Sequence, residues 1–160
     1  MANALMTLDR PASPTTYGTT QQQFVTMQLS NQWFGISVLS VQDVLRNLTV
    51  SPIPLAPSCV AGALNIRGRI VTAIDMRARL GMDATETPGA MFVVVECQHE
   101  LFALMVDAVG DVLDLSMRDF EAPPANLDAQ WRNIAAGVFK LKKGLLVIMD
   151  VMNVVDGACA

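Results

Sequence analysis

The sequence predicts an all-β fold with a few short helices, built from two similar halves whose small sheets pack together. Three observations carry this prediction: runs of aromatic and β-branched residues at strand length, short polar connections between the runs, and two internal sequence overlays. Of the 160 residues, 52% are hydrophobic and 16% are charged. A chain of this length and composition can bury one ordinary domain-sized core.

Two predicted hairpins repeat the same pattern. Residues 24–30 and 33–38 are rich in aromatic and β-branched types around Asn31 and Gln32, which indicates a β-hairpin. The pattern recurs at residues 91–97 and 101–106, around the sequence Gln-His-Glu. We therefore expect two equivalent hairpins, one in each half.

The remaining elements follow from local composition. Nearly continuous apolar runs at 92–95 and 145–149 indicate strands covered on both faces, and hence two packed sheets. Asp75 and Asp150 each end an apolar strand, where a carboxylate can cap the backbone of a short helical turn. Residues 117–132 contain two consecutive prolines and are expected to form a loop with one helical turn.

An internal duplication explains the order of these elements. At an offset of 68, the stretch from Phe24 to Leu45 overlays Phe92 to Leu113. The first stretch ends in Val-Gln-Asp-Val-Leu and the second in Val-Gly-Asp-Val-Leu. At an offset of 75, Ala61-Gly62 overlays Ala136-Gly137, and Asp75 overlays Asp150. Chance similarity between strand-rich segments is the alternative, but the conserved order of the matched pieces favours duplication.

Several classes of protein are disfavoured by composition. Residues 1–80 carry a net charge of +3 and residues 81–160 a net charge of −7, which argues against general nucleic-acid binding. Three widely spaced cysteines and no CxxC pair argue against a disulfide framework or a zinc site and fit a cytoplasmic protein. The longest plausible apolar window, 47–66, lacks charge but contains three prolines and several polar residues, so no membrane insertion is expected. Residues 1–20 are small, polar and proline-containing, and we expect a flexible segment without a secretion signal.

Catalytic machinery is not predicted. His99 is the single histidine and falls in a predicted turn beside Glu100, where an exposed position is expected. The sequence contains no nucleophile elbow, dinucleotide fingerprint or phosphate loop. Asp107, Asp111 and Asp114 match no calcium-loop spacing and are expected at solvated strand edges. The sequence therefore predicts a protein that is not an enzyme and that needs no cofactor or metal.

One run, from Val60 to Gly81, carries the strongest functional signal. It places Arg67 and Arg69 around Gly68, and the glycine permits a tight turn between two strands. A guanidinium held at a turn is a common anchor for protein partners. We interpret the turn as a docking element. An ion pair between Arg67 and a carboxylate of the same chain is the alternative.

The chain resembles the CheW family of chemotaxis coupling proteins. The resemblance extends from about Phe24 to Val155 and rests most heavily on an NxRG motif followed by DxRxxLG. The matching residues are Val41, Gln42, Asp43, Val44, Ile53, Pro54, Val60, Gly62, Asn65, Arg67, Gly68, Asp75, Arg77, Leu80 and Gly81. The resemblance implies two small SH3-like β-barrels that share a hydrophobic core. We expect one domain over 21–157, with barrels over about 21–84 and 90–157 and with strands free to exchange between them.

The resemblance also implies a function and a set of site residues. It implies a cytoplasmic, non-catalytic adaptor that joins the cytoplasmic tip of chemoreceptors to the regulatory domain of the histidine kinase CheA, recruited to membrane-associated receptor arrays. Position by position, it assigns the receptor-binding surface to Val41, Gly62 and Arg67, with Met91 and Phe92 on the adjoining strand. It assigns no residues to the kinase-binding surface.

Alternatives to these roles remain at the sequence level. Val41 could serve only the core, and Gly62 only the strand geometry. The same fold occurs in the kinase regulatory domain and in CheV proteins, but no kinase core or receiver pattern is found in this sequence. An unrelated small β-barrel enzyme or ligand-binding protein is the alternative from a different functional class.

Overall fold

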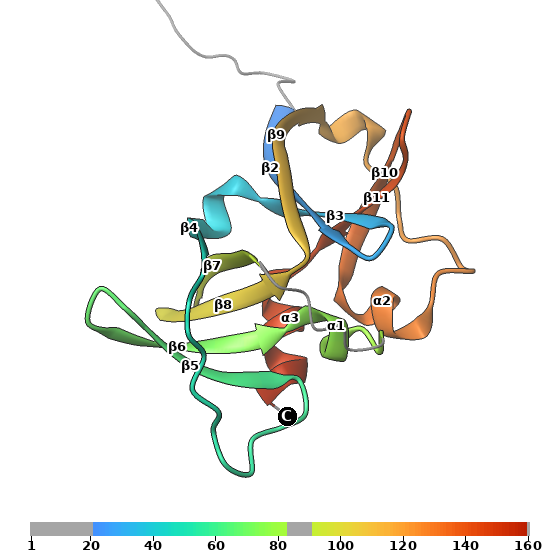
Figure 1. The fold of residues 1–160 in the computed structure, drawn as a ribbon. Coiled ribbons are helices and arrows are strands. Elements are labelled where there is room, and N and C mark those ends of the chain that lie inside the picture. The colour runs from blue at the N-terminus through green and yellow to red at the C-terminus, as the bar shows by residue number, and fades with distance from the viewer. Residues whose placement is uncertain (1–20, 83–90, 160) are drawn as a thin grey trace, which may run out of the picture.

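Two five-stranded sheets form the framework of the molecule (Figure 1). The computed structural model describes residues 21–82 and 91–159, so the expectation for residues 1–20 lies outside the described part. The first sheet contains β2 (Gln21–Leu29), β3 (Gln32–Ser37), β9 (Ala108–Ser116), β10 (Ala135–Leu141) and β11 (Gly144–Met149). The second contains β4 (Val41–Arg46), β5 (Val60–Ile66), β6 (Arg69–Asp75), β7 (Met91–Cys97) and β8 (Glu100–Val106).

The two halves of the chain exchange hairpins. The strand order is β10-β11-β3-β2-β9 in the first sheet and β4-β7-β8-β6-β5 in the second. The early hairpin β2–β3 thus joins the late strands, and the later hairpin β7–β8 joins the early strands. Each inserted hairpin meets its host sheet through one parallel contact, β3 with β11 and β8 with β6.

The internal overlays correspond to equivalent positions in the two sheets. An offset of 75 carries β5 onto β10 and β6 onto β11, and an offset of 68 carries β3 onto β8 and β4 onto the middle of β9. The second sheet, written from its β5 edge, has the order β5-β6-β8-β7-β4. This order matches β10-β11-β3-β2-β9 of the first sheet, strand for equivalent strand. The prediction of two similar units follows from the sequence overlays, whereas the exchange of hairpins is seen only in the structure.

Both sheets curl into small barrels in the same way. Ser51, which follows β4, exchanges two backbone hydrogen bonds of 2.9 and 2.8 Å with Ala63 of β5. Glu121, which follows β9, pairs in the same manner with Val138 of β10, with two bonds of 2.9 Å. These paired backbone groups close each sheet and satisfy part of its open edge.

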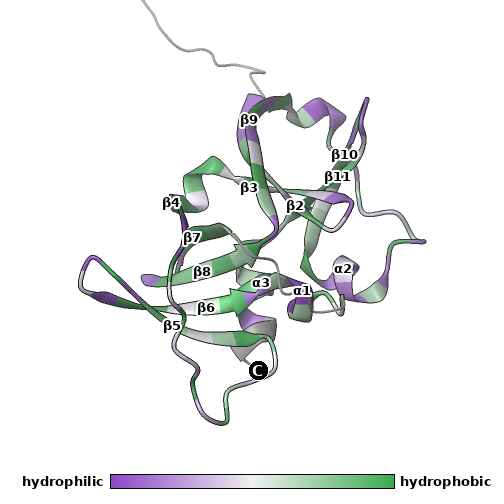
Figure 2. Cartoon of the chain, viewed as in Figure 1, coloured by the Kyte–Doolittle hydropathy of each residue, from purple (hydrophilic) through white to green (hydrophobic). Residues whose placement is uncertain are grey.

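Three apolar clusters fill the molecule. One lies inside the first barrel around Phe24, Phe139 and Leu146, and another lies inside the second barrel around Leu64, Val71 and Phe92. The third and largest joins strands of both sheets to the helices. It is the shared core, and Figure 2 shows the corresponding green segments of the strands where the two sheets face each other.

Short helices occupy the expected places. Asp75 accepts hydrogen bonds from the backbone N–H groups of Arg77 and Ala78, and so caps α1 (Met76–Arg79). Asp150 accepts from Met152 at the start of α3 (Val151–Cys159), which is longer than the single turn that we expected. The remaining helical segments are η1 (Val38–Ser40), η2 (Met117–Asp119) and α2 (Ala129–Ile134). Among the described residues, no helix is long and apolar enough to cross a membrane.

The predicted hairpin boundaries are confirmed to within a few residues. The mainly-β class, the hairpins and the helical turns after Asp75 and Asp150 are all present. The first hairpin turns at Ser30 and Asn31, one residue before the predicted position, because Leu29 pairs with Gln32. Ser30 takes the positive φ of 57° that the turn requires. The apolar runs in β7 and β11 are buried on both faces, as expected.

Candidate docking surface of the second barrel

The turn between β5 and β6 holds Arg67 in a defined position. Ile66 pairs with Arg69, so that Arg67 and Gly68 alone form the turn, with φ values of 53° and 83°. Positive φ at both central residues is the signature of a type I′ turn. The side chain of Asn65 accepts a hydrogen bond of 3.0 Å from the Gly68 N–H. The predicted tight turn is confirmed, and glycine at its second position removes the steric cost of that φ.

Arg67 also forms an ion pair inside the chain. Its Nη2 lies 2.8 Å from Oδ2 of Asp43 on β4, while the other carboxylate oxygen of Asp43 accepts from the Val44 N–H. The side chain of Arg67 is 78% exposed and that of Asp43 is 27% exposed. An ion pair so open to water stabilises the fold by at most about 1 kcal/mol. Most of the guanidinium therefore remains accessible to a partner while Asp43 limits its direction.

Val41 begins β4 at the boundary between the two barrels. It lies opposite Val95 of β7 and is half-buried against the shared core. Gln42 is the extra residue of a bulge after Val41, and its amide donates a hydrogen bond of 3.2 Å to Glu96. Val41 therefore presents part of its side chain to the surface and part to the core.

The backbone geometry at Gly62 requires a glycine. It lies at a bulge in β5 with a φ of +151°, and a Cβ placed there would stand 2.2 Å from the carbonyl oxygen of Ser51. That distance is far inside van der Waals contact, so only glycine lets the Ser51 backbone close the barrel. Gly137 has the equivalent place in the first barrel. A Cβ added there would stand 2.2 Å from the Phe120 ring.

The two residues of β7 differ in accessibility. Met91 is half-buried and opposes Arg46, whose Nη2 lies 3.8 Å from the Met91 sulfur. Phe92 is 3% exposed inside the second barrel, so its ring offers no surface to a partner in this structure. Val41 and Met91 lie at opposite ends of the β4–β7 ladder, about 13 Å apart along the strand direction. The structure thus brings Arg67 close to β4 but leaves Met91 at a distance.

A groove between the two barrels begins beside Val41. Its volume is ≈ 540 Å³, and both polar and apolar side chains line it. The lining includes Ser40, Glu96, Gln98, Phe120, Ile148 and Met152. Sequence analysis missed this groove, because its walls come from segments as distant in sequence as Gln22 and Met152, which only the tertiary structure brings together.

The titratable residues also differ in part from expectation. Asp111 and Asp114 are exposed, as expected, but Asp107 is not a solvated edge residue. Its side chain is 20% exposed and binds Arg77 of α1 through both carboxylate oxygens, with an Nε–Oδ1 distance of 2.9 Å. The bond from Arg77 is the main cause that lowers the pKa of Asp107 below its usual 3.8, with help from the Ser30 N–H. The error arose because the partner lies 30 residues away.

No catalytic arrangement emerges from the described residues. His99 is exposed in the β7–β8 turn with a φ of 69°, as the sequence predicted. Within residues 21–82 and 91–159, no three histidine, cysteine or acidic side chains are grouped so that they could hold a metal ion. Cys59 and Cys97 are buried. What the second barrel offers is a surface: an oriented arginine, a half-exposed valine and an adjacent groove.

Comparison with known proteins agrees with this picture. Residues 23–159 match the family model of the CheW-like domain. The chain is 28% identical over 134 residues to the chemotaxis protein CheW of Rhizobium meliloti, covering 83% of this chain and 86% of that protein. It is 27% identical over 150 residues to the chemotaxis protein CheW of Treponema pallidum, covering 91% and 88% of the two chains.

A solved structure shares the fold. The crystal structure of the scaffolding protein TtCheW from Thermoanaerobacter tengcongensis superposes with a TM-score of 0.72 at 24% sequence identity, covering 81% of this chain and 88% of that one. The prediction of two SH3-like barrels with a shared hydrophobic core is confirmed.

Proposed function

Because the chain belongs to the family of CheW-like domains, we propose that it is a non-catalytic adaptor that couples chemoreceptors to the histidine kinase CheA in bacterial chemotaxis. The observation that carries this proposal is the family match, which spans residues 23–159 and so includes every described strand but the first two residues of β2. An adaptor works by presenting surfaces rather than reacting groups. The oriented arginine and the groove beside Val41 support that mode of action.

The proposed receptor-binding surface is centred on Arg67 and Val41. Arg67 keeps 78% of its side chain exposed, and Asp43 holds it beside β4, where Val41 begins the strand. A preoriented guanidinium next to an apolar side chain is typical of an interface anchor, because less conformational entropy is lost on binding. Gly62 acts through the backbone by allowing the barrel to close behind the β5–β6 hairpin.

Met91 and Phe92 take lesser roles in the proposal. Met91 can contribute only to the rim of the surface, at the far end of the β4–β7 ladder. Phe92 supports β7 from inside the barrel. The protein would work in the cytoplasm at receptor arrays, where its receptor and kinase partners are both present.

The proposal is tested by direct binding. The purified protein should bind both a receptor cytoplasmic fragment and the regulatory domain of CheA in calorimetric titrations, and it should raise receptor-dependent kinase activity when all three are mixed. Absence of binding to both partners by a folded protein would reject the adaptor function. The alternative of a small β-barrel enzyme or ligand-binding protein would instead require turnover or a ligand-dependent rise in melting temperature.

A further inference from the structure

The groove beside Val41 continues toward the start of the described chain. Gln22 of β2 and Ser37 of β3 line the groove, and the same two residues line a second hollow of ≈ 380 Å³. The other walls of that hollow are Gln21, Gln23, Val38, Leu39 and Asp114. Gln21 is the first described residue. Residues 1–20 therefore join the described chain at the lip of a hollow that leads into the groove.

The lining of the groove and the second hollow combines apolar and acidic side chains. Large apolar groups of the groove are Phe24, Met117, Phe120, Ile148 and Met152. Leu39 on η1 is 88% exposed and Met152 on α3 is 46% exposed. The charged residues of the combined lining are Glu96, Asp114 and Asp150, and none of the described residues that line either hollow is basic. An apolar segment that ends in a cation complements such a surface.

The chain carries a segment of this kind ahead of β2. Residues 4–10 read Ala-Leu-Met-Thr-Leu-Asp-Arg. Successive side chains of an extended chain point to opposite sides. One side of this segment then carries Met6, Leu8 and Arg10, and the other side carries the acidic Asp9. Arg10 is the single basic side chain among residues 1–20, so the apolar side of the segment ends in its one cation.

The connection to β2 is long enough for the segment to reach the groove. Residues 11–20 read Pro-Ala-Ser-Pro-Thr-Thr-Tyr-Gly-Thr-Thr, a composition typical of a linker. The chain from Leu8 to Gln21 spans about 40 Å when extended, which exceeds what a groove of this volume requires. A segment on such a tether has an effective concentration in the millimolar range. A few apolar contacts therefore suffice to keep it bound.

We propose that residues 4–10, which we call the strap, fold back onto the groove of the same molecule. Met6 and Leu8 pack against its apolar walls, and Arg10 faces the exposed carboxylate of Glu96. A groove filled in this way is closed to other ligands, so the strap is autoinhibitory. The position of the strap depends only on the groove, whereas its inhibitory effect rests on the proposed function, because the ligand that it excludes is the receptor proposed to bind beside Val41.

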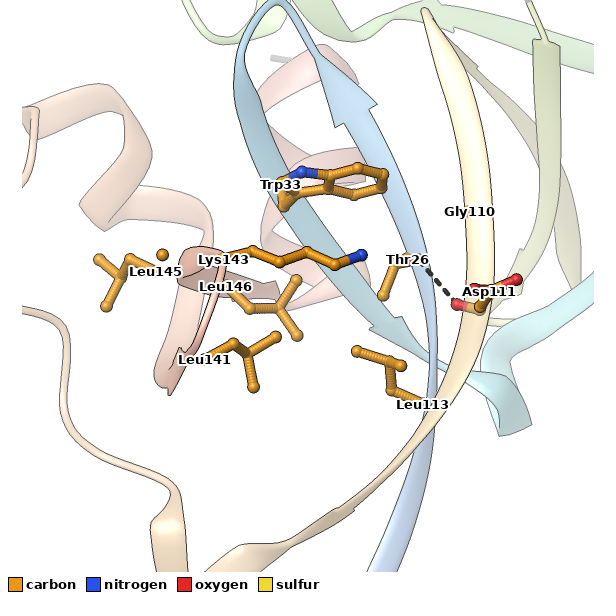
Figure 3. A pocket seen from close by; sticks show the side chains of 10 residues that line it. Thr26, Trp33, Gly110, Asp111, Leu113, Leu141, Lys143, Leu145 and Leu146 are labelled. Carbon is orange, nitrogen blue, oxygen red and sulfur yellow. Dashed lines mark hydrogen bonds between the residues drawn. The ribbon is translucent and has the colours of Figure 1, made fainter.

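The mouth of the first barrel is a poorer site for the strap. Its cavity measures ≈ 70 Å³, too little for two large apolar side chains. Lys143, from the turn between β10 and β11, lies across this cavity with its Nζ 5.1 Å from the centre of the Trp33 ring (Figure 3). The ammonium group of Lys143 would repel Arg10, whereas the carboxylates of the groove attract it.

NMR of the full chain with ¹³C-labelled leucine and methionine methyl groups tests the position of the strap. The Leu8 methyl groups should show nuclear Overhauser effects to the methyl groups of Met117 and Met152, which line the groove. Leu8→Asp should remove these effects and shift the signals of both methionines. Thr7→Asp is the matched control, because it adds the same charge on the opposite side of the strap, and it should leave them unchanged.

Two results would overturn the position of the strap. One is the absence of these effects in the wild-type protein. The other is that they arise between copies, which a mixture of labelled and unlabelled protein reveals.

Calorimetric titration with a receptor fragment tests the inhibitory effect. Leu8→Asp should bind the fragment about fivefold or more tightly than the wild type, because the apparent dissociation constant falls as the free fraction of the groove rises. Thr7→Asp should bind like the wild type. Equal affinities of the wild type and Leu8→Asp would overturn the inhibitory role. If none of the three proteins bound the receptor, the proposed function would be rejected, whereas the nuclear Overhauser effects from Leu8 would still establish the strap.

Discussion

Arg67 and Asp43 are separated by 24 residues, yet Nη2 of the arginine lies 2.8 Å from Oδ2 of the aspartate. The contact joins the β5–β6 turn to β4 across the barrel opening. The sequence left two interpretations of Arg67, a docking residue or an internal ion pair. The structure contains the ion pair. Because the side chain of Arg67 remains 78% exposed, it can still contact a partner.

Substitution of Arg67 should affect binding more than stability. Arg67→Ala is expected to weaken receptor binding by about 2 kcal/mol, roughly 30-fold, and Arg67→Glu by more. The free energy of unfolding should fall by no more than about 1 kcal/mol, because the ion pair is exposed. Calorimetric titration with a receptor fragment, beside urea denaturation, measures both effects. Arg69→Glu, at the first residue of β6, is the neighbouring control.

A charge exchange separates the two roles. Arg67→Asp combined with Asp43→Arg can restore an ion pair but moves the guanidinium to β4. If the receptor binds Arg67 itself, the double variant stays defective. Recovery of full affinity would show that the pair matters only for the fold.

Val41 should separate docking from packing. A lysine at this half-buried position can direct its amine outward along its aliphatic stem, so Val41→Lys is expected to block receptor binding while lowering the melting temperature only slightly. Val93→Lys is the buried comparison, since Val93 on β7 is 0% exposed, and it should unfold the protein. Normal receptor binding by folded Val41→Lys would remove Val41 from the proposed surface.

Gly62→Ala should destabilise the second barrel. The added Cβ would lie 2.2 Å from the Ser51 carbonyl oxygen, so the closing backbone pair must move, at a cost of about 2 kcal/mol or more. Gly68→Asn is the control, because nothing lies within 4 Å of a Cβ there and asparagine tolerates its φ. Urea denaturation compares them, and equal stability of both variants would contradict the close-approach argument.

Acid should selectively remove the contribution of Asp107. Because Arg77 lowers the pKa of Asp107 in the folded state, its carboxylate stabilises the fold above the unfolded pKa of about 3.9, and this contribution disappears as the pH falls through the lower folded pKa. Asp107→Asn should therefore cost about 1–3 kcal/mol at pH 7. The difference from the wild type should shrink below pH 4. A difference in unfolding free energy that stays constant from pH 7 to pH 2.5 would contradict this assignment.

Unfolding should be a single cooperative transition. Each barrel contains a hairpin from the other half of the chain, and the largest apolar cluster joins both sheets, so neither half can retain its own barrel. Calorimetric and van't Hoff enthalpies should agree. Two resolved melting steps, or a folded fragment of residues 91–160 alone, would contradict the interdependence of the halves.

The sequence by itself determined the class of fold, the approximate positions of the two hairpins and the turn at Arg67. These features are local, since they depend on alternating or continuous apolar residues, on Gly68 and on capping carboxylates such as Asp75, all read within one turn or strand. The duplication could also be detected in the sequence, because equivalent strands of the two halves retain similar residues in the same order. The family followed from motifs of the same short range.

The tertiary structure alone decided which strands share a sheet and which side chains meet. Either half could pair with its own hairpin or with that of the other, since both hairpins present similar apolar faces, and the sequence contains no local signal for the choice. The Asp43–Arg67 and Asp107–Arg77 pairs, the close approach of Gly62 to Ser51 and the groove beside Val41 are also seen only in the tertiary structure. Such contacts form between residues distant in sequence, so the shared core that positions the two barrels decides them.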